Sequence, residues 1–186
     1  KDTLLAAIVP IFLGFGFVIA KPAFEYFPPL LLMGLRFTIA AMILIWWFPI
    51  PKKNLKELFF VSLVANTIQY SLTYSGLNMI DASAAVLIVM CEVPFGIIAA
   101  YLLLKEKPGA RSIIGILIAF LGVYTLSGSP NLEGKFLGMF LVFSGAGMWG
   151  LGQVLAKPLT KKMNPIALAA WLCLMSGPVL IALSAI

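Results

Sequence analysis

The sequence predicts an all-α, polytopic membrane protein of inverted five-helix repeats, and three observations lead to this fold class. Hydrophobic residues make up 62% of the 186 residues and charged residues 11%, whereas soluble domains contain about 25% charged residues. Seven apolar segments approach the roughly 20 residues that a helix needs to cross a bilayer. A motif at the end of the first segment occurs again at the end of the sixth.

The seven apolar segments are expected to form one membrane-spanning helix each. In chain order they are residues 4–20, 29–48, 58–77, 82–104, 112–126, 136–156 and 165–186. The fifth is the shortest, but it is almost continuously apolar. Stretches such as 105–111 and 127–134 contain Pro and Gly residues that favour turns between helices. The short alternating strands of a membrane β-barrel are not visible in the sequence.

The positive charges predict the orientation of these helices. Ten of the 13 Lys and Arg residues fall at the amino terminus or in alternate loops, and the positive-inside rule places this set in the cytoplasm. The set comprises Lys1, Lys52, Lys53, Lys56, Lys105, Lys107, Arg111, Lys157, Lys161 and Lys162. We therefore expect a multi-pass protein of the cytoplasmic membrane with a cytoplasmic amino terminus. The net charge of +6 then reports topology and does not indicate a nucleic-acid partner.

The repeated motif predicts the domain organisation. The pattern Gly-x-Gly-x-Val-x-Ala-Lys-Pro occupies residues 14–22 and returns at 150–158, an offset of 136 (150 − 14 = 136). Five helices separate the copies, and because this number is odd, the second copy is inverted across the membrane. We expect a complete first repeat at 1–128 and the first two helices of a second at 129–186. Inverted repeats are typical of transporters that bind substrate between related halves.

Residue types that most enzymes need are missing from the chain. There is no histidine, and both cysteines, Cys91 and Cys173, lie within apolar segments, where we expect packing roles. The absence of histidine removes His-dependent triads, imidazole metal ligands and His proton relays. No phosphate-binding glycine loop or paired-carboxylate motif is present. We therefore expect no catalytic residue, no metal and no cofactor.

Two charged residues lie inside predicted helices. At 1.5 Å per residue, Glu92 is about 15 Å deep in the fourth segment and Arg36 about 10 Å deep in the second. A charge at the bilayer centre costs on the order of 3 kcal/mol even on the most lenient scale. One interpretation is a structural Glu92–Arg36 pair that fixes helix packing. The other places Glu92 on the substrate or proton path, because an unpaired carboxylate in a low dielectric favours binding a proton.

The third segment carries a polar stripe. Its members are Ser62, Asn66, Gln69 and Thr73, with Tyr70 at the edge and a weaker stripe of Thr67, Tyr74 and Asn78 to one side. The spacing of 4, 3 and 4 residues places the first four within an arc of about 60° on a helix. Such a face forms either interhelical hydrogen bonds, worth about 0.6 kcal/mol each, or the lining of a cavity. Together with Glu92, a polar central cavity is the simplest common explanation.

The sixth segment is unusually rich in glycine over residues 144–153. Small residues allow helices to approach closely, and glycines also permit the bending that a gate needs. We favour close packing as their role. Trp149 and Gln153 lie one turn apart on one face, so both are candidates for lining the substrate pathway. Trp46 and Trp47 lie at the end of the second helix and are interpreted as part of an aromatic belt.

Several of these motifs occur in the order and spacing of a known family. The residues concerned are 14–21, 28–37, Glu92-Val-Pro94, 104–107 and the stretch from Gly115 to Gly122. They resemble the EamA-type branch of the drug/metabolite transporter superfamily over essentially the whole chain. The resemblance implies ten helices in two inverted five-helix repeats, so three more helices are expected after residue 186. Several members of the family export amino acids or related metabolites through a central cavity.

The resemblance also implies roles for individual residues. Arg36 is similar to the second-helix arginine of the family, Glu92 with Pro94 to its fourth-helix Glu-x-Pro region, and Glu106 to the acidic residue of the following loop motif. The chain departs from the pattern at Leu13, where a Trp often precedes the first glycine, and at Lys105, where the family often has Gly. These departures bear on substrate assignment and leave the expected fold unchanged.

The function expected from these observations is secondary transport, with export of amino acids or related small metabolites by alternating access. The alternatives are a permease of the same superfamily for sugars, nucleotide sugars or cationic drugs, a membrane enzyme, and a non-transporting membrane scaffold. The expected partners are a small-molecule substrate and the lipid bilayer. Proton coupling and a homodimer are further options that the sequence leaves open.

Overall fold

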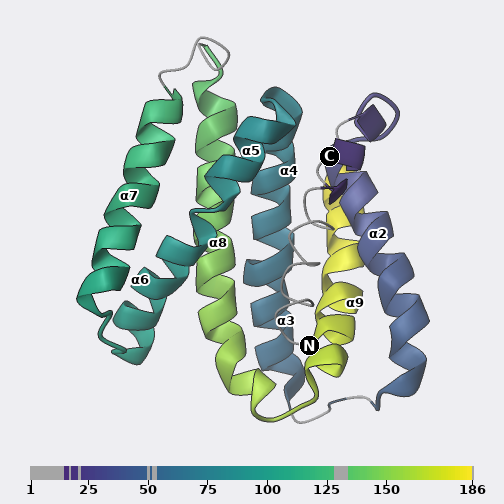
Figure 1. The fold of residues 1–186 in the computed structure, drawn as a ribbon. Coiled ribbons are helices and arrows are strands. Elements are labelled where there is room, and N and C mark those ends of the chain that lie inside the picture. The colour runs from purple at the N-terminus through teal and green to yellow at the C-terminus, as the bar shows by residue number, and fades with distance from the viewer. Residues whose placement is uncertain are drawn as a thin grey trace.

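A computed structural model describes residues 15–16, 18–20, 22–49, 51, 54–127 and 134–185, and within this part of the chain the regular structure is helical, with no strand. Most of the predicted first helix, residues 4–20, lies outside the described residues. The other helices stand side by side between two ends of the molecule (Figure 1). The described part is therefore the all-α bundle that the sequence predicts.

The helices have the following bounds. In chain order they are α2 (Pro29–Leu44), η1 (Ile45–Trp47), α3 (Leu55–Ser62), η3 (Leu63–Ile68), α4 (Gln69–Met79), α5 (Ala82–Val89), α6 (Glu92–Leu104), α7 (Ala110–Ser127), α8 (Phe136–Thr160) and α9 (Pro165–Ser184). Prolines at the first position of α2 and α9 suit helix starts, because the N–H that proline lacks has no partner within the helix there.

Fewer helices than expected are both long and apolar enough to cross a membrane. Among the described residues there are four: Pro29–Trp47, Ala82–Leu104, Phe136–Thr160 and Pro165–Ser184. The segment predicted at 112–126 is a shorter apolar helix, Ala110–Leu126. The segment predicted at 58–77 is helical throughout but is not one of the four, because its polar stripe lowers its hydropathy.

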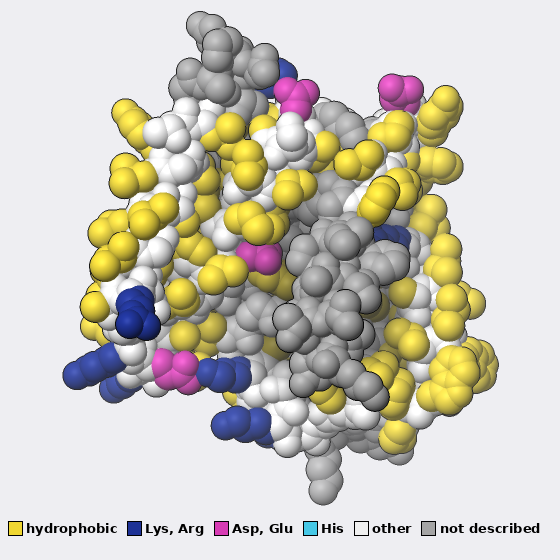
Figure 2. All heavy atoms as spheres, in the orientation of Figure 1, with side chains coloured by type: hydrophobic (Ala, Val, Ile, Leu, Met, Phe, Trp, Pro, Cys, Tyr) yellow, Lys and Arg dark blue, Asp and Glu magenta, His cyan; other side chains and the backbone are white. Residues whose placement is uncertain are grey.

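The chain runs up and down through the bundle. The ends of η1, α6 and α8 lie at one end of the molecule, and the ends of α4, α7 and α9 lie at the other (Figure 1). We call the first the basic end, defined by Lys56, Lys105, Lys107, Lys161 and Lys162. Most dark blue side chains visible in Figure 2 gather there, while apolar side chains cover the flanks between the ends. This distribution fits a bundle that crosses a membrane.

Glycines bring α8 into close contact with its neighbours. A Cβ on Gly138 would lie 2.8 Å from the Cβ of Met79 at the end of α4, and one on Gly152 would lie 2.5 Å from the Cβ of Ala65 in η3. On another face, a Cβ on Gly150 would lie 2.5 Å from the backbone nitrogen of Gly96 in α6. The packing role that the sequence favoured for these glycines is confirmed.

The second tight contact joins α2 to α9, which lie side by side and run in opposite directions (Figure 1). A Cβ on Gly34 would lie 2.8 Å from the backbone nitrogen of Ile181 and 3.0 Å from the carbonyl oxygen of Gly177. A Cβ on Gly177 would lie 3.0 Å from the backbone nitrogen of Thr38. Larger side chains at either glycine would push the two helices apart.

Candidate functional site

The fourth predicted span is broken in its middle. Helix α5 ends at Val89, Met90 and Cys91 form a turn, and α6 begins at Glu92. Pro94 explains the break, because it has no N–H to donate to the carbonyl of Met90, four residues earlier, and its ring would clash with that carbonyl. The N–H of Val93 approaches the Met90 carbonyl at 3.4 Å instead. The sequence signal for this break was Pro94, which the span prediction did not use.

The break places Glu92 at the first position of α6. The free N–H groups and positive dipole end of a helix stabilise a nearby carboxylate, typically by 0.3–1 kcal/mol. Glu92 is partly buried. Half-helices that end within the membrane are a recurrent feature of transporter binding sites, because their termini present backbone charge to substrates and ions.

The amino-terminal half of the polar stripe, Ser62 and Asn66, forms hydrogen bonds to α9. Ser62 Oγ donates a hydrogen bond to the carbonyl of Leu172 at 3.0 Å, and Asn66 Nδ2 donates to Ser176 Oγ at 3.3 Å. Ser176 Oγ in turn donates to the Leu172 carbonyl at 2.8 Å. Asn66 lies in η3, whose wider π-helical turn is a feature often found at functional sites. Ser62 and Asn66 therefore tie this helix to α9.

The carboxy-terminal half of the stripe, Gln69 and Thr73, faces α8. Gln69 Nε2 donates a hydrogen bond to Thr73 Oγ1 at 3.2 Å, and both side chains are buried. Thr73 packs directly against Gly145 of α8. Gln69 Oε1 is buried and has no hydrogen-bond partner among the described residues. A buried acceptor left without a partner costs about 1–3 kcal/mol, so Gln69 is a natural contact point for a polar solute or water.

The three residues of the weaker stripe, Thr67, Tyr74 and Asn78, lie in three different surroundings. Thr67 is 2% exposed, and its hydroxyl is without a hydrogen-bond partner among the described residues. Tyr74 is buried on the side of α2, whereas Asn78 is exposed near the end of α4. Asn78 also lines a cavity of about 340 Å³ with Pro22 and Glu25. This cavity lies at the end of the bundle away from the basic end.

An aromatic row follows α4 on the side of α2. The rings of Tyr70 and Tyr74 are stacked at 5.6 Å, and Phe37 of α2 meets Tyr70 edge-on at 4.7 Å. Phe24 extends the row by meeting Tyr74 edge-on at 6.1 Å. Arg36 precedes Phe37 on α2 and is exposed. The row therefore packs α2 against α4.

Arg36 and Glu92 do not form the ion pair that was one interpretation of the sequence. The ion pairs within the described part of the chain lie near the surface and join Lys135 to Asp81, Lys157 to Glu106 and Lys162 to Glu57. The two charges that the sequence predicts inside helices therefore lie on different helices, α2 and α6, with no ion pair between them among the described residues.

Trp149 and Gln153 lie on α8, near its contact with α6. Trp149 is partly buried and Gln153 is exposed, and between them Gly150 packs against Gly96. Both side chains lie one helical turn apart, as the sequence predicts for residues of one face. No hydrogen bond joins them to the polar stripe within the described residues.

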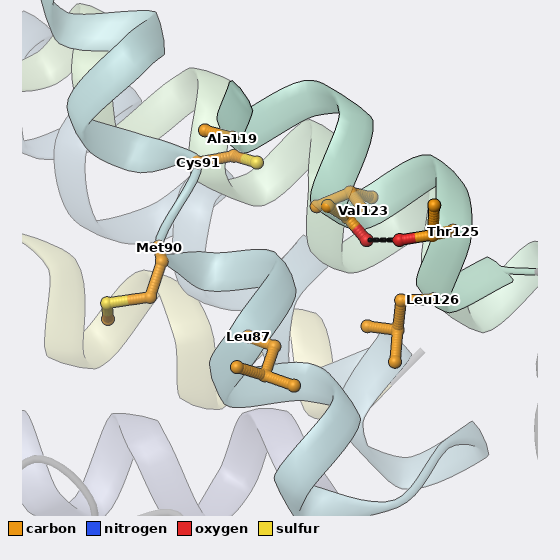
Figure 3. Close-up of a pocket in the computed structure, with 8 residues that line it drawn as sticks. Leu87, Met90, Cys91, Ala119, Val123, Thr125 and Leu126 are labelled. Atoms are coloured by element: carbon orange, nitrogen blue, oxygen red, sulfur yellow. Dashed lines mark hydrogen bonds between the residues drawn. The ribbon is translucent and has the colours of Figure 1, made fainter. Parts of the chain in front are cut away.

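A cavity of about 470 Å³ lies beside the broken helix (Figure 3). Its lining comprises Leu87, Met90, Cys91, Ala119, Gly122, Val123, Thr125 and Leu126. The hydroxyl of Thr125 donates a hydrogen bond to the carbonyl of Gly122 at 2.9 Å. A second, aromatic cavity of about 380 Å³ lies between α7 and α8. Neither cavity is lined by the polar stripe, so the predicted central cavity is not one of these.

Metal binding finds no support in the part of the chain that the structure describes. No group of three or more His, Cys, Asp or Glu side chains is placed there to hold an ion. What the arrangement offers instead is a charge of each sign, an aromatic row and a buried amide at middle depth. These are groups that bind a small polar or charged solute reversibly.

Comparisons with known proteins agree with this chemistry. The model of the EamA-like transporter family matches residues 2–128. The chain is 29% identical over 161 residues to a probable amino-acid metabolite efflux pump of Escherichia coli, with 84% of this chain and 54% of the pump covered. It is 31% identical over 178 residues to an uncharacterized transporter of Bacillus subtilis, with 91% of this chain and 58% of that protein covered. The chain thus spans little more than half the length of these relatives. No solved structure matches it.

Proposed function

Because the chain belongs to the EamA-like transporter family, we propose that it is part of a secondary transporter that exports amino acids or related small metabolites. A small-molecule substrate and a membrane environment follow from the family. The substrate class is supported by the relative named a probable amino-acid metabolite efflux pump. Sugars, nucleotide sugars and cationic drugs are the competing substrate classes.

The observation that carries this proposal is a charge of each sign at middle depth, Arg36 and Glu92, with no ion pair between them among the described residues. Arg36 and Glu92 each cost on the order of 3 kcal/mol in a bilayer centre unless water, a partner or a solute compensates them. A purely structural role would favour direct pairing, and that pair is not formed among the described residues. A pathway that admits water and a polar solute accounts for both charges.

Alternating access between inverted repeats is the mechanism we propose. The starts of α2 and α9, Pro29 and Pro165, are separated by the same 136 residues as the repeated motif (165 − 29 = 136), and the two helices run in opposite directions. Gly34 and Ala41 correspond at this offset to Ala170 and Gly177, so small residues occupy equivalent buried positions. This supports a pseudo-two-fold axis in the membrane plane, about which one repeat rocks against the other.

The orientation proposed for the protein places the basic end in the cytoplasm of the cell, as the positive-inside rule predicts. Cysteines introduced at Lys107 and Lys161 should resist an impermeant thiol reagent added to intact cells, whereas those at Glu25 and Asp81 should react. The native cysteines are first replaced by alanine. The opposite labelling pattern would reverse the orientation, and equal labelling would indicate dual insertion.

A membrane scaffold is the rival function, and one observation favours it. Ser62 and Asn66 form hydrogen bonds to α9, as interhelical packing would require. A scaffold would need the same bonds but would have no use for the unpaired acceptor of Gln69 or for the charges of Arg36 and Glu92. The two functions therefore predict different effects of substitutions at these two groups of residues.

Efflux from loaded vesicles tests the proposal. The whole protein is reconstituted, the vesicles are loaded with labelled amino acids, and release is followed with and without an imposed pH gradient. We expect faster release than from loaded vesicles that lack the protein. The pH gradient should accelerate this release if Glu92 carries the coupling proton. In that case Glu92→Gln should abolish the response to the gradient at saturating substrate. No release of any amino acid would refute the substrate class, and hydrolysis or modification of the solute would refute transport.

A further inference from the structure

Buried apolar side chains of the described residues gather in two clusters, one in each half of the bundle. The inner cluster lies near the basic end and comprises Leu58, Val61, Ala65, Ala156, Leu159, Leu168 and Trp171. The outer cluster lies towards the opposite end and includes Phe37, Leu77, Ile88, Val142 and Leu180. We propose that the inner cluster is the gate that closes the transport pathway at the basic end, and that Trp171 controls its opening. This inference rests on the proposed function and assigns one of the two closures that alternating access requires.

Depths along the helices separate the two clusters. Helices α3 and α9 both begin at the basic end, and the inner-cluster residues of α3, η3 and α9 lie within ten residues of these starts, or about 15 Å at 1.5 Å per residue. Leu180 of the outer cluster lies at about 22 Å on the same scale. A buried polar layer lies between the clusters: Asn66 and Ser176 are each eleven residues from their starts (66 − 55 = 11, 176 − 165 = 11), and Gln69 follows one turn later. Apolar closures on both sides of a polar layer are expected of a pathway with both gates shut.

The inner cluster joins helices of both predicted repeats. Leu58 comes from α3 in the first repeat, and Trp171 comes from α9 in the second. The hydrogen bonds that Ser62 and Asn66 donate to α9 cross the same boundary. Each joins residues 110 positions apart, so α9 runs beside α3 and η3 in the same direction. Rocking of one repeat against the other must part this contact, and parting it uncovers the polar layer.

Trp171 is the residue of the inner cluster whose side chain carries a polar group. This side chain is 7% exposed, yet its indole Nε1 has no hydrogen-bond partner among the described residues. Buried tryptophan N–H groups usually find an acceptor. An unsatisfied buried donor disfavours the state that buries it by roughly fivefold to a hundredfold. Trp171 therefore seals the closed gate with its ring and destabilises it with its N–H.

This balance suits a gate, because a transporter must populate both the closed and the open state in each cycle. Burial of the apolar side chains favours the closed inner cluster. Lost hydration of the Trp171 N–H opposes it, and opening the gate returns water to that group. A cluster that served packing alone would have no use for the unsatisfied donor.

A cysteine behind the inner cluster reports whether the gate is open. Gln69 lies one turn beyond Ala65 on the same side of its helix, so Gln69→Cys places a thiol in the polar layer next to the cluster. The native Cys91 and Cys173 are first replaced by alanine. Alkylation of the whole protein by an impermeant thiol reagent is then followed in right-side-out and in inverted membrane vesicles, which present opposite faces to the reagent.

Two substitutions at Trp171 should move the gate in opposite directions. Trp171→Phe keeps a ring but removes the N–H, so alkylation from the side of the basic end should slow about fivefold or more. Trp171→Ala removes the seal, so alkylation from that side should accelerate at least about tenfold. Trp171→Phe decides the test if Trp171→Ala does not reach the membrane. An unchanged rate in Trp171→Phe would overturn the proposal, and so would an equal change from both sides.

Two controls keep the test specific. Trp46→Phe removes an indole N–H at a position that is 84% exposed and should change neither rate. Leu180→Ala opens the outer cluster on the same helix as Trp171 and should accelerate alkylation from the opposite side alone. If Leu180→Ala accelerated alkylation from the side of the basic end as much as Trp171→Ala, the inner cluster would not be the gate.

Amino-acid efflux by the Trp171 variants, measured without the reporter cysteine, separates this inference from the proposed function. Efflux without a sided change in alkylation would refute the gate and leave the proposed transport function intact. Sided changes without amino-acid efflux would support the gate and refute the substrate class. If neither efflux nor a sided change is found, both are refuted.

Discussion

Asn66 Nδ2 lies 3.3 Å from Ser176 Oγ, and this hydrogen bond joins the π-helical segment η3 to the middle of α9. The two residues are 110 positions apart in the chain and come from different predicted repeats. The bond therefore couples the helix that carries the polar stripe to α9, which belongs to the predicted second repeat. Any movement of one repeat against the other must break it or carry η3 along with α9.

A double-mutant cycle should detect this bond. Asn66→Ala, Ser176→Ala and the double variant are compared by their free energies of unfolding in detergent. We expect a coupling energy of about 0.6 kcal/mol, the average for hydrogen bonds between membrane helices. Ser176 keeps its own bond to the Leu172 carbonyl in Asn66→Ala, so the cycle isolates the contact. Strictly additive effects would show that the two side chains do not interact in the membrane.

Gln69→Leu separates cavity lining from packing. Leucine removes the unpaired buried acceptor Oε1 and fills a similar volume, so stability should stay within about 1 kcal/mol of the unmodified protein. If Gln69 contacts the solute, efflux should nevertheless fall at least tenfold. Membrane abundance and the thermal midpoint are measured beside efflux. Normal efflux with lowered stability would mean that Gln69 only holds helices together.

Gly145→Ala tests the close approach of α4 and α8. The added methyl group would overlap Thr73, whose backbone nitrogen would lie 3.0 Å from it, and we expect a loss of about 1–3 kcal/mol in the free energy of unfolding. Gly115→Ala in α7 is the control, because no atom lies within 4 Å of its added Cβ. That variant should be neutral or stabilised by up to about 1 kcal/mol, since alanine favours helix. Equal effects of the two substitutions would contradict the packing found at Gly145.

Pro94→Ala tests the function of the broken helix. Alanine restores the N–H that can bond to the Met90 carbonyl, so α5 and α6 should tend to join and displace Glu92. Efflux is expected to fall at least tenfold while membrane abundance stays near normal. Pro178→Ala is the matched control, because Pro178 lies inside α9 without ending it. Unchanged efflux in Pro94→Ala would show that the break is not needed for transport.

The sequence by itself determined the helical class, the family and, for the described helices, the boundaries to within a few residues. These features depend on local properties: an apolar run long enough for a bilayer and a proline or glycine where it ends. The predicted span at 82–104 is an instructive exception. Its composition is continuous, but Pro94 removes one backbone hydrogen bond and divides it into α5 and α6.

Only the tertiary structure decided which polar residues meet. A helical pattern places the four residues of the polar stripe on one face. In the structure, Ser62 and Asn66 of that face contact α9, whereas Thr73 contacts α8. It also decided that Arg36 and Glu92 form no ion pair with each other among the described residues. The periodicity of one helix determines on which side of that helix each side chain lies. Partners on other helices depend on how closely glycines let those helices approach, which is a property of the packed bundle.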